Sequence, residues 1–105
     1  MLNQIIIVGR LAKEIEIEEL ENGGHVAYIT VVVPRSYKNI DGTYETDIVP
    51  VTIYDTIAKN IKEYCHKGDV LGIKGRVQMT GDNLDEQVRI VAEKVTFLSS
   101  KSEEE

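Results

Sequence analysis

The chain has 105 residues, of which 42% are hydrophobic and 29% are charged, and its formal net charge is -6 at pH 7. These values suit one globular domain with a modest core, and no apolar run approaches the ~20 residues of a membrane-spanning helix. The single cysteine, Cys65, excludes an internal disulfide, and without a Cys/His cluster no metal site is expected. The opening MLNQIIIVGR lacks a basic region and a cleavage site, which favours a cytoplasmic protein.

Two β-strands are predicted in the first third of the chain. Residues 3–11 (NQIIIVGRL) and 25–33 (HVAYITVVV) are rich in β-branched side chains, and Pro34 is expected to end or blunt the second run. Between them, residues 13–20 (KEIEIEEL) alternate acids with apolar side chains, the period of a half-buried strand, and residues 22–24 (NGG) form a turn. This part of the chain therefore predicts antiparallel β-structure.

A hairpin and a third strand are predicted next. Asp41-Gly42 is a strong turn sequence, and it lies between the second run and residues 47–54 (DIVPVTIY), which have the pattern of a strand. Pro50 within this strand indicates an edge position or a bulge, because proline donates no ladder hydrogen bond.

The pattern then changes to helical steps over residues 55–68 (DTIAKNIKEYCHKG). Asp55 suits the N-cap of this helix, Lys67 suits its last turn, and Gly68 suits the position that follows it. One helix of about three turns is therefore predicted in an otherwise β-rich chain.

Two further strands complete the pattern, over residues 69–79 and 87–98, joined by an acidic turn over residues 81–86. A phase shift of the apolar positions after Ala92 indicates a β-bulge. The order β-β-β-α-β-β is that of the OB-fold, an all-β, five-stranded Greek-key barrel with one helix between strands 3 and 4.

One domain is expected over residues 1–98. The remaining residues, 99–105 (SSKSEEE), contain no apolar side chain and are predicted to form a short disordered acidic tail.

Three stretches, MLNQIIIVGRL, ENGGHVAYITVVV and VTIYDTIAKNIKEYCHKGDVLGIKGRVQ, resemble the bacterial single-stranded-DNA-binding proteins of replication and repair. The resemblance is collinear from residue 1 to about residue 98. It implies an OB-fold without catalytic activity or essential cofactor, which binds single-stranded DNA with little sequence preference. It also implies a homotetramer, with a dimer as the other option.

The resemblance places aromatic DNA contacts on the predicted hairpin and third strand. Tyr37 falls where the family has a stacking aromatic, and Tyr54 falls at the aromatic that ends the third strand. Ile48 stands where some members carry a tryptophan, so that platform is absent here. Lys38, Lys67, Lys74 and Arg76 lie in regions where members carry cations that contact DNA.

The residues themselves support a strand-binding groove, because a ring on a sheet surface stacks on any base and a cation beside it neutralises phosphate. Arg35 and Tyr44 stand with Tyr37 and Lys38 on the hairpin, and Arg10 follows a strand glycine. The candidate DNA-binding residues are Arg10, Arg35, Tyr37, Lys38, Tyr44, Tyr54, Lys67, Lys74 and Arg76. No catalytic constellation accompanies them, so no enzyme is expected.

Other interpretations compete for individual side chains. Tyr44 and Tyr54 are evenly divided between stacking on DNA and packing, whereas Tyr28 and Tyr64 are expected to pack in the core or against the helix. Cys65 lies on the apolar stripe of the predicted helix, so we expect it to pack rather than react.

Three features depart from the family pattern. The strand EIEIEE and the turn MTGDNLDEQ are acidic where relatives often carry cations, and misplaced acids repel phosphate. The chain stops at SSKSEEE without the proline and phenylalanine with which the family typically docks replication and repair partners. Recruitment of such partners through the tail is therefore in doubt.

Binding and protection of single-stranded DNA in replication, recombination or repair is the main hypothesis. A second hypothesis is an OB-fold protein-interaction module, such as a primosome-like accessory protein, in which the acidic segments have replaced the DNA surface. A third is an OB-fold that binds structured RNA.

Overall fold

The computed structural model describes residues 1–81 and 87–100. Within these residues the elements follow in the order β1 (Ile5–Leu11), β2 (Ile17–Glu19), β3 (His25–Lys38), β4 (Tyr44–Tyr54), α1 (Asp55–Tyr64), β5 (Val70–Thr80) and β6 (Gln87–Ser99). No helix in this part of the chain is long and apolar enough to cross a membrane.

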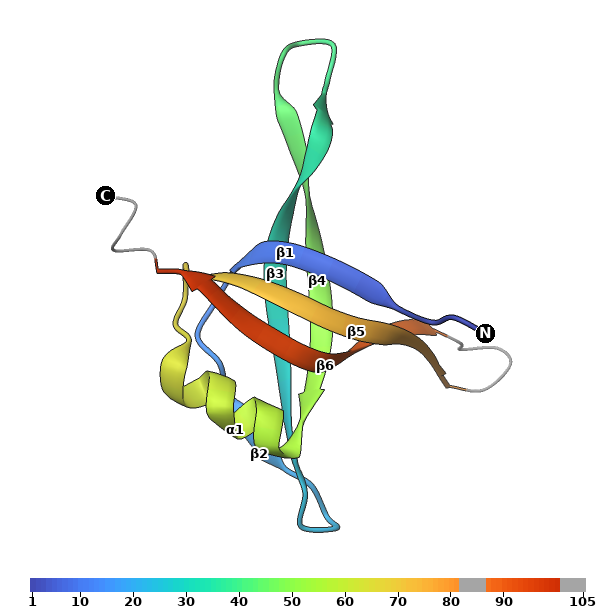
Figure 1. Cartoon of the computed structure of the whole chain (residues 1–105), viewed down its shortest axis with the longest axis vertical. Coiled ribbons are helices and arrows are strands. Elements are labelled where there is room, and N and C mark those ends of the chain that lie inside the picture. The colour runs from blue at the N-terminus through green and yellow to red at the C-terminus, as the bar shows by residue number, and fades with distance from the viewer. Residues whose placement is uncertain (82–86, 101–105) are drawn as a thin grey trace.

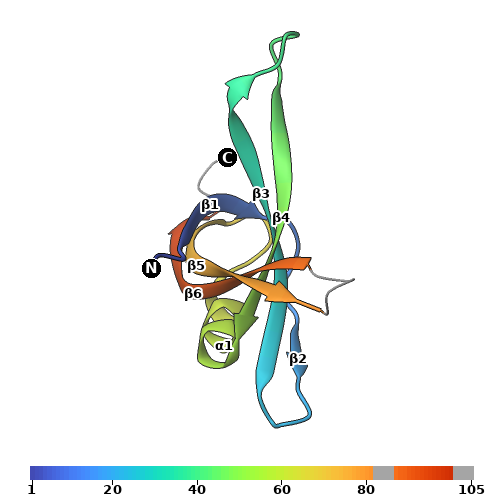
Figure 2. The same ribbon diagram turned by 90° about the vertical axis from the view of Figure 1, so that its right-hand side faces the viewer.

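Five of the strands close into a barrel. They are neighbours in the order β1-β5-β6-β4-β3, and a further pairing of β1 with β3 completes the ring, which Figure 2 shows in cross-section. The pairing of β4 with β6 is parallel, at Thr52 and Val91, and the other pairings are antiparallel. The all-β OB-fold that the sequence predicts, with one helix between the third and fourth strands of the barrel, is confirmed.

Alternation along the strands fills the barrel. Within the barrel, the odd-numbered residues 27–33 of β3 and 49–53 of β4 point inward, and the even-numbered residues between them point to the outer face. The inward side chains of β3 and β4 meet those of β1 and β5 in one core: Leu11, Ala27, Ile29, Val31, Val51, Ile53, Leu71 and Ile73. Each large aliphatic side chain buried in this way contributes roughly 1.5–3 kcal/mol.

The helix α1 covers one end of the barrel (Figure 1). Ala58 and Ile61 bury one side of the helix in the core, and the Cys65 side chain that follows is also buried, as expected. Next to this buried side, Lys62 Nζ donates a hydrogen bond of 2.7 Å to the carbonyl oxygen of Ile15. This bond attaches the helix to the segment that leads into β2.

Both predicted ends of the helix are wrong. The N-cap is Tyr54, which makes no side-chain cap bond, and Asp55 is the first helical residue with a φ of 49°. Aspartate tolerates this left-handed conformation, and here its Oδ1 accepts a hydrogen bond of 3.0 Å from the backbone N–H of His25. The Asp55 carboxylate therefore joins the start of the helix to the start of β3 instead of capping the helix.

At its other end the helix stops at Tyr64, and Lys62 is the basic residue of its last turn. Gly68 belongs to a separate turn, closed by a hydrogen bond of 3.0 Å from Asp69 N–H to His66 C=O. Its φ of 95° is one that glycine adopts readily. Lys67 lies in this turn and not in the helix.

Pro34 does not end its strand, contrary to expectation, since β3 continues to Lys38 and Pro34 pairs with Thr46. The carbonyl of Thr30 accepts a hydrogen bond from Ala12 N–H, so the even-numbered residues of β3 turn their polar groups toward β1 rather than β4. Pro34 is one of these even-numbered residues, so its backbone faces away from β4 and no hydrogen bond to β4 is lost. The pairing of β1 with β3 is limited to Val31 and Val32, so β1 has no partner bond at Pro34 either.

Of two other strand predictions, the one for residues 13–20 is only partly correct and the one for the bulge after Ala92 is confirmed. The stretch 13–20 is strand only at Ile17–Glu19, although Ile15 is buried between exposed neighbours as its alternation predicts. The bulge after Ala92 is confirmed, because Lys74 pairs with Lys94 and Gly75 with Ala92. Residues 82–86, within the predicted acidic turn, and residues 101–105 of the predicted tail lie outside the described residues.

Gly75, beside this bulge, leaves no room for a side chain between β5 and β6. A Cβ atom at Gly75 would overlap the backbone oxygen of Val91, whereas one at Gly72 in the same strand would make an ordinary contact of 3.5 Å with Leu98. We expect Gly75→Ala to lower the free energy of unfolding by roughly 1–3 kcal/mol, the usual effect of overpacking. Urea denaturation measures this, with Gly72→Ala as the control variant. Equal stability of Gly75→Ala and Gly72→Ala would contradict the prediction.

Candidate functional site

The outer face of β4 carries a line of side chains from the barrel to the tip of the hairpin. By alternation these are Tyr44, Thr46, Ile48, Pro50, Thr52 and Tyr54. Ile48 is 70% exposed and Tyr44 is 53% exposed. On β3, Tyr28 pairs with Thr52 and is also 53% exposed, so it adds a ring to the same face. We call this surface the outer sheet face.

Tyr54 lies at the barrel end of the outer sheet face and is half-buried. Its hydroxyl is 3.4 Å from Nη1 of Arg89 on β6, which donates a hydrogen bond to it. Beside this pair is a hollow of about 180 Å³, whose lining includes Tyr28, Thr52 and Arg89. Of the two orientations left open by the sequence, the structure therefore has Tyr54 on the outer face.

The expectation that Tyr28 and Tyr64 pack in the core or against the helix is wrong, since they are 53% and 68% exposed. Residues 25–33 are apolar on both faces of the strand, so their pattern does not reveal which parity points outward. Arg89 was also missed. Its place in an alternating strand predicts an exposed cation, but nothing in the sequence places it beside Tyr54.

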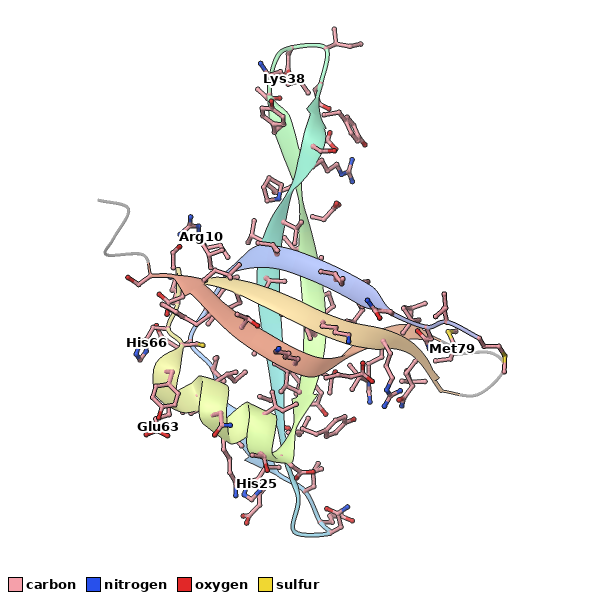
Figure 3. The ribbon with its side chains drawn as sticks, in the orientation of Figure 1. Arg10, His25, Lys38, Glu63, His66 and Met79 are labelled. Atoms are coloured by element: carbon pink, nitrogen blue, oxygen red, sulfur yellow. The ribbon has the colours of Figure 1, made fainter. Side chains whose placement is uncertain are left out.

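The hairpin formed by β3 and β4 projects from the barrel, with Lys38 near its far end (Figure 3). Lys38 Nζ lies 5.7 Å from the centre of the Tyr44 ring, within the range of a cation–π contact. The predicted turn at Asp41-Gly42 is confirmed, with Gly42 N–H donating to Asn39 C=O at 3.0 Å. Tyr37, on the same hairpin, is 61% exposed.

Arg35 has two acidic partners on the neighbouring strand. Its Nη2 is 2.9 Å from Asp47 Oδ1, and its Nη1 is 2.7 Å from Glu45 Oε2. Glu45 and Asp47 alternate with the side chains of the outer sheet face, so this cluster lies on the reverse face of the hairpin. The positive charge of Arg35 is matched within the protein.

These contacts perturb the hairpin carboxylates. Hydrogen bonds from Arg35 lower the pKa of Asp47, and hydrogen bonds from the Thr43 side chain and backbone lower the pKa of Asp41. The Asp47 hydrogen bond, with smaller contributions that include Tyr37, raises the pKa of Arg35. Both carboxyl groups therefore remain ionised at pH values below the ordinary carboxyl pKa. Their hydrogen bonds stabilise the tip and the stem of the hairpin.

Arg10 and Lys67 lie close together near the base of the hairpin. Arg10 Nη1 donates a hydrogen bond of 2.6 Å to the carbonyl oxygen of Gly68, next in the chain to Lys67. Arg10 also lines a groove of about 360 Å³ with Val32, Pro34 and Thr46 at the base of the hairpin. Figure 3 places Arg10 and Met79 at opposite ends of the barrel, so this pair is remote from the hollow beside Tyr54.

Lys74 and Arg76 share the outer surface of β5, as their spacing predicts. Lys74 lies between Ile6 of β1 and Lys94 of β6. Arg76 Nη1 donates a hydrogen bond of 2.6 Å to Gln78, and its Nε is 3.8 Å from Glu93. The candidate residues thus fall into separate groups, of which Tyr44, Lys38 and Tyr54 are on or beside the outer sheet face and Arg10 reaches it through the groove that it shares with Thr46.

The described residues offer little for other chemistry. No group of three or more His, Cys, Asp and Glu side chains among them could hold a metal ion. The Cys65 thiol is buried, and burial, with a smaller contribution from Asp69, raises its pKa. The reactive thiolate is therefore disfavoured.

Comparison with known proteins decides between the families that use this fold. Residues 2–98 match the Single-strand binding protein family. The chain belongs to this family. It is 36% identical to single-stranded DNA-binding protein B of Bacillus subtilis (strain 168), with 99% of this chain and 96% of that protein covered. It is 33% identical to single-stranded DNA-binding protein 1 of Clostridium acetobutylicum, with 97% and 98% covered.

A solved structure supports the fold assignment. A deletion mutant of the single-stranded DNA binding protein from Thermus aquaticus superposes with a TM-score of 0.77 at 17% sequence identity. The match covers 96% of this chain and 52% of that chain, so this protein spans about half of its length. The family's fold is therefore preserved despite low identity.

The Arg35 cluster generates a prediction about pH. Because Arg35 stabilises ionised Asp47 in the folded hairpin, this stabilisation is present above the unfolded carboxyl pKa of about 3.9 and is lost as pH falls through the lowered pKa of Asp47. We expect Arg35→Gln to return the Asp47 pKa toward its ordinary value, as followed by NMR titration of the carboxyl carbons. Asp41, whose partner is Thr43, is the control and should not move.

Proposed function

We propose that this protein binds single-stranded DNA, largely without sequence preference, and does so as a non-enzymatic component of replication, recombination or repair. Membership of the single-strand binding protein family carries the proposal. The relatives from B. subtilis and C. acetobutylicum are named for this binding and match over almost their whole length. The family match favours this function over the protein-interaction module and the RNA-binding OB-fold.

The outer sheet face supplies the chemistry that a single strand needs. Tyr28, Tyr44 and Tyr54 present rings to a surface on which bases can stack, and Lys38 and Arg89 add positive charge beside them. Tyr37 adds a further exposed ring on the hairpin, which Tyr44 already reaches from the outer sheet face. Because stacking uses a face that every base has, such a surface binds strands of any sequence.

The cations differ in their readiness to bind phosphate. Lys38, Lys67 and Lys74 are exposed, and Lys38 stands near the hairpin tip. Arg35 and Arg76 must share their charge with acids, so a phosphate has to compete with Glu45, Asp47 and Glu93. We therefore assign general backbone contacts first to the lysines, with Arg10 beside Lys67 at the base of the hairpin.

We propose that the protein assembles as a homotetramer through the face formed by β1, β5 and β6. Ile6 and Val8 are 68% and 52% exposed there, and Leu98 is 50% exposed. β1 pairs with β3 only at Arg10 and Leu11, so the edge of its first residues is open to a strand from another copy. A second copy would cover both the apolar side chains and the open edge.

The remaining parts of the proposal concern its setting. A protein that binds transient single strands of the chromosome would act in the cytoplasm, and we propose that it needs no cofactor. We propose that residues 1–98 are the DNA-binding domain and that the acidic residues 99–105 are a tail.

Binding is tested first with an oligothymidine of about 35 nucleotides, longer than the ~4–16 that one OB-fold occupies. We expect quenching of tyrosine fluorescence and an affinity that falls as salt rises. Tyr37→Ala with Tyr54→Leu should lower affinity by roughly 1–3 kcal/mol per ring, and leucine keeps the half-buried position filled. Tyr64→Ala, on the helix, is the matched control. Unchanged affinity of the folded double variant would remove these rings from the site.

Assembly is tested with Ile6→Glu and Val8→Glu. Because both side chains are exposed in the single chain, a charge there should leave the monomer folded but prevent a second copy from covering this face. Analytical ultracentrifugation should show a tetramer for the unaltered protein and smaller species for the variants. A tetramer that survives both changes would exclude this face as the interface.

A further inference from the structure

The hollow beside Tyr54 has the position and lining of a binding site. It lies between the outer sheet face and the end of the hairpin formed by β5 and β6. Its lining residues are Tyr28, Pro50, Thr52, Thr80, Gln87, Val88, Arg89 and Ile90. Two of the residues that define it, Tyr28 and Arg89, are absent from the contacts that the sequence and the family resemblance suggested.

The size of the hollow limits what can enter. Its volume is about 180 Å³. That is below the ~300–1,000 Å³ typical of sites for whole small molecules. A hollow of this size suits one flat ring system, with the sugar and phosphate of the same nucleotide outside it.

The walls suit a base more than an aliphatic group. Tyr28 contributes an aromatic ring that is 53% exposed, and Pro50 contributes an apolar surface next to it on β4. Thr52 is only 5% exposed and lies opposite Tyr28 in the ladder, so it forms the floor. The Arg89 side chain and the Gln87 amide provide polar groups at the β6 side.

Arg89 supplies donors that can discriminate between bases. Its Nη1 bonds to the Tyr54 hydroxyl at 3.4 Å, and this contact orients a guanidinium that has five donors and no acceptor. The base edge that complements such a group presents two acceptors side by side. Guanine does so with O6 and N7, the edge that arginine contacts most often, whereas thymine offers a single acceptor, O4, on the corresponding edge.

The hollow also lies beside the part of the outer sheet face where β4 carries no aromatic side chain. Ile48, midway along β4, is 70% exposed but carries no aromatic surface. Tyr28 is on the adjacent strand of the same face, between Ile48 and Tyr54 in the register of the ladder. A base held against Tyr28 would therefore continue the path of a strand that also stacks on Tyr54.

We infer that this hollow is a nucleobase pocket, in which one base of a bound single strand stacks on Tyr28 and turns its edge toward Arg89, with guanine preferred. The inference rests on the proposed binding of single-stranded DNA and adds to it a preference at one position of an otherwise unselective surface. Within the pocket, the Tyr28 ring contributes affinity for any base, and Arg89 contributes the preference among bases.

The test compares oligothymidine of about 16 nucleotides, one OB-fold site at most, with the same strand carrying one central guanine or one central adenine. For the unaltered protein we expect the guanine strand to bind at least about fivefold more tightly than plain oligothymidine. The adenine strand should fall between them or match oligothymidine, because it presents one acceptor beside a donor.

Variants assign the preference to the pocket. Arg89→Lys keeps the positive charge but loses the planar pair of donors, so the ratio of the guanine and plain affinities should fall to about one. Tyr28→Ala should weaken binding of all strands at least fivefold, and Tyr28→Phe should restore it, because stacking needs the ring and not the hydroxyl. Tyr64→Ala should leave the ratio unchanged. Circular dichroism confirms that each variant folds.

The outcomes separate this inference from the proposed function. If the unaltered protein binds no strand, the proposed function fails and the pocket fails with it. If it binds all strands equally and Tyr28→Ala changes none of the affinities, the pocket is refuted while DNA binding stands. A guanine preference that persists in Arg89→Lys would also refute the pocket, because another residue would then be reading the base.

Discussion

The antiparallel ladder between β3 and β4 is the constraint on which both the barrel and the candidate site depend. It runs from the pairing of Val26 with Tyr54 to that of Pro34 with Thr46, and beyond the barrel it becomes the stem of the hairpin. A slip of one residue would exchange its two faces, bringing Ile29 and Val51 to solvent and the tyrosines into the core. The free energy of packing the core therefore also fixes which rings reach the outer sheet face.

The sequence predicted the element order because its periodicities are strong, and the bulge after Ala92 because the apolar phase changes there. The predictions from sequence failed at residues whose role depends on which neighbour their polar groups face in the folded chain. Pro34 resembles a strand end, but its missing N–H points away from β4. Asp55 resembles a helix cap, but its carboxylate is taken by His25, 30 residues away. Tyr28 stands in a run without alternation, so its exposure required the register of the neighbouring strand.

The candidate site was predictable as a set of residue types and less so as a surface. Tyrosines and cations on a hairpin indicate a place for bases and phosphates, and the structure does carry rings along one face. Which cations are engaged depends on contacts between strands, such as that of Arg35 with Asp47, and no local pattern reports them. The acidic balance of the chain thus acts through particular pairs, which weaken some cations and leave lysines such as Lys38 exposed.

The position of β1 in the barrel has a consequence for how the protein emerges from the ribosome. The main partner of β1 is β5, and the Asn3 side chain extends this pairing by two hydrogen bonds of 2.8 Å to the backbone of Val77, 74 residues later. At synthesis rates of ~5–20 residues per second, the apolar stretch of β1 waits roughly 4–15 s for that partner. Asn3 and Arg10 flank the stretch, polar side chains of the kind that limit aggregation of a waiting strand.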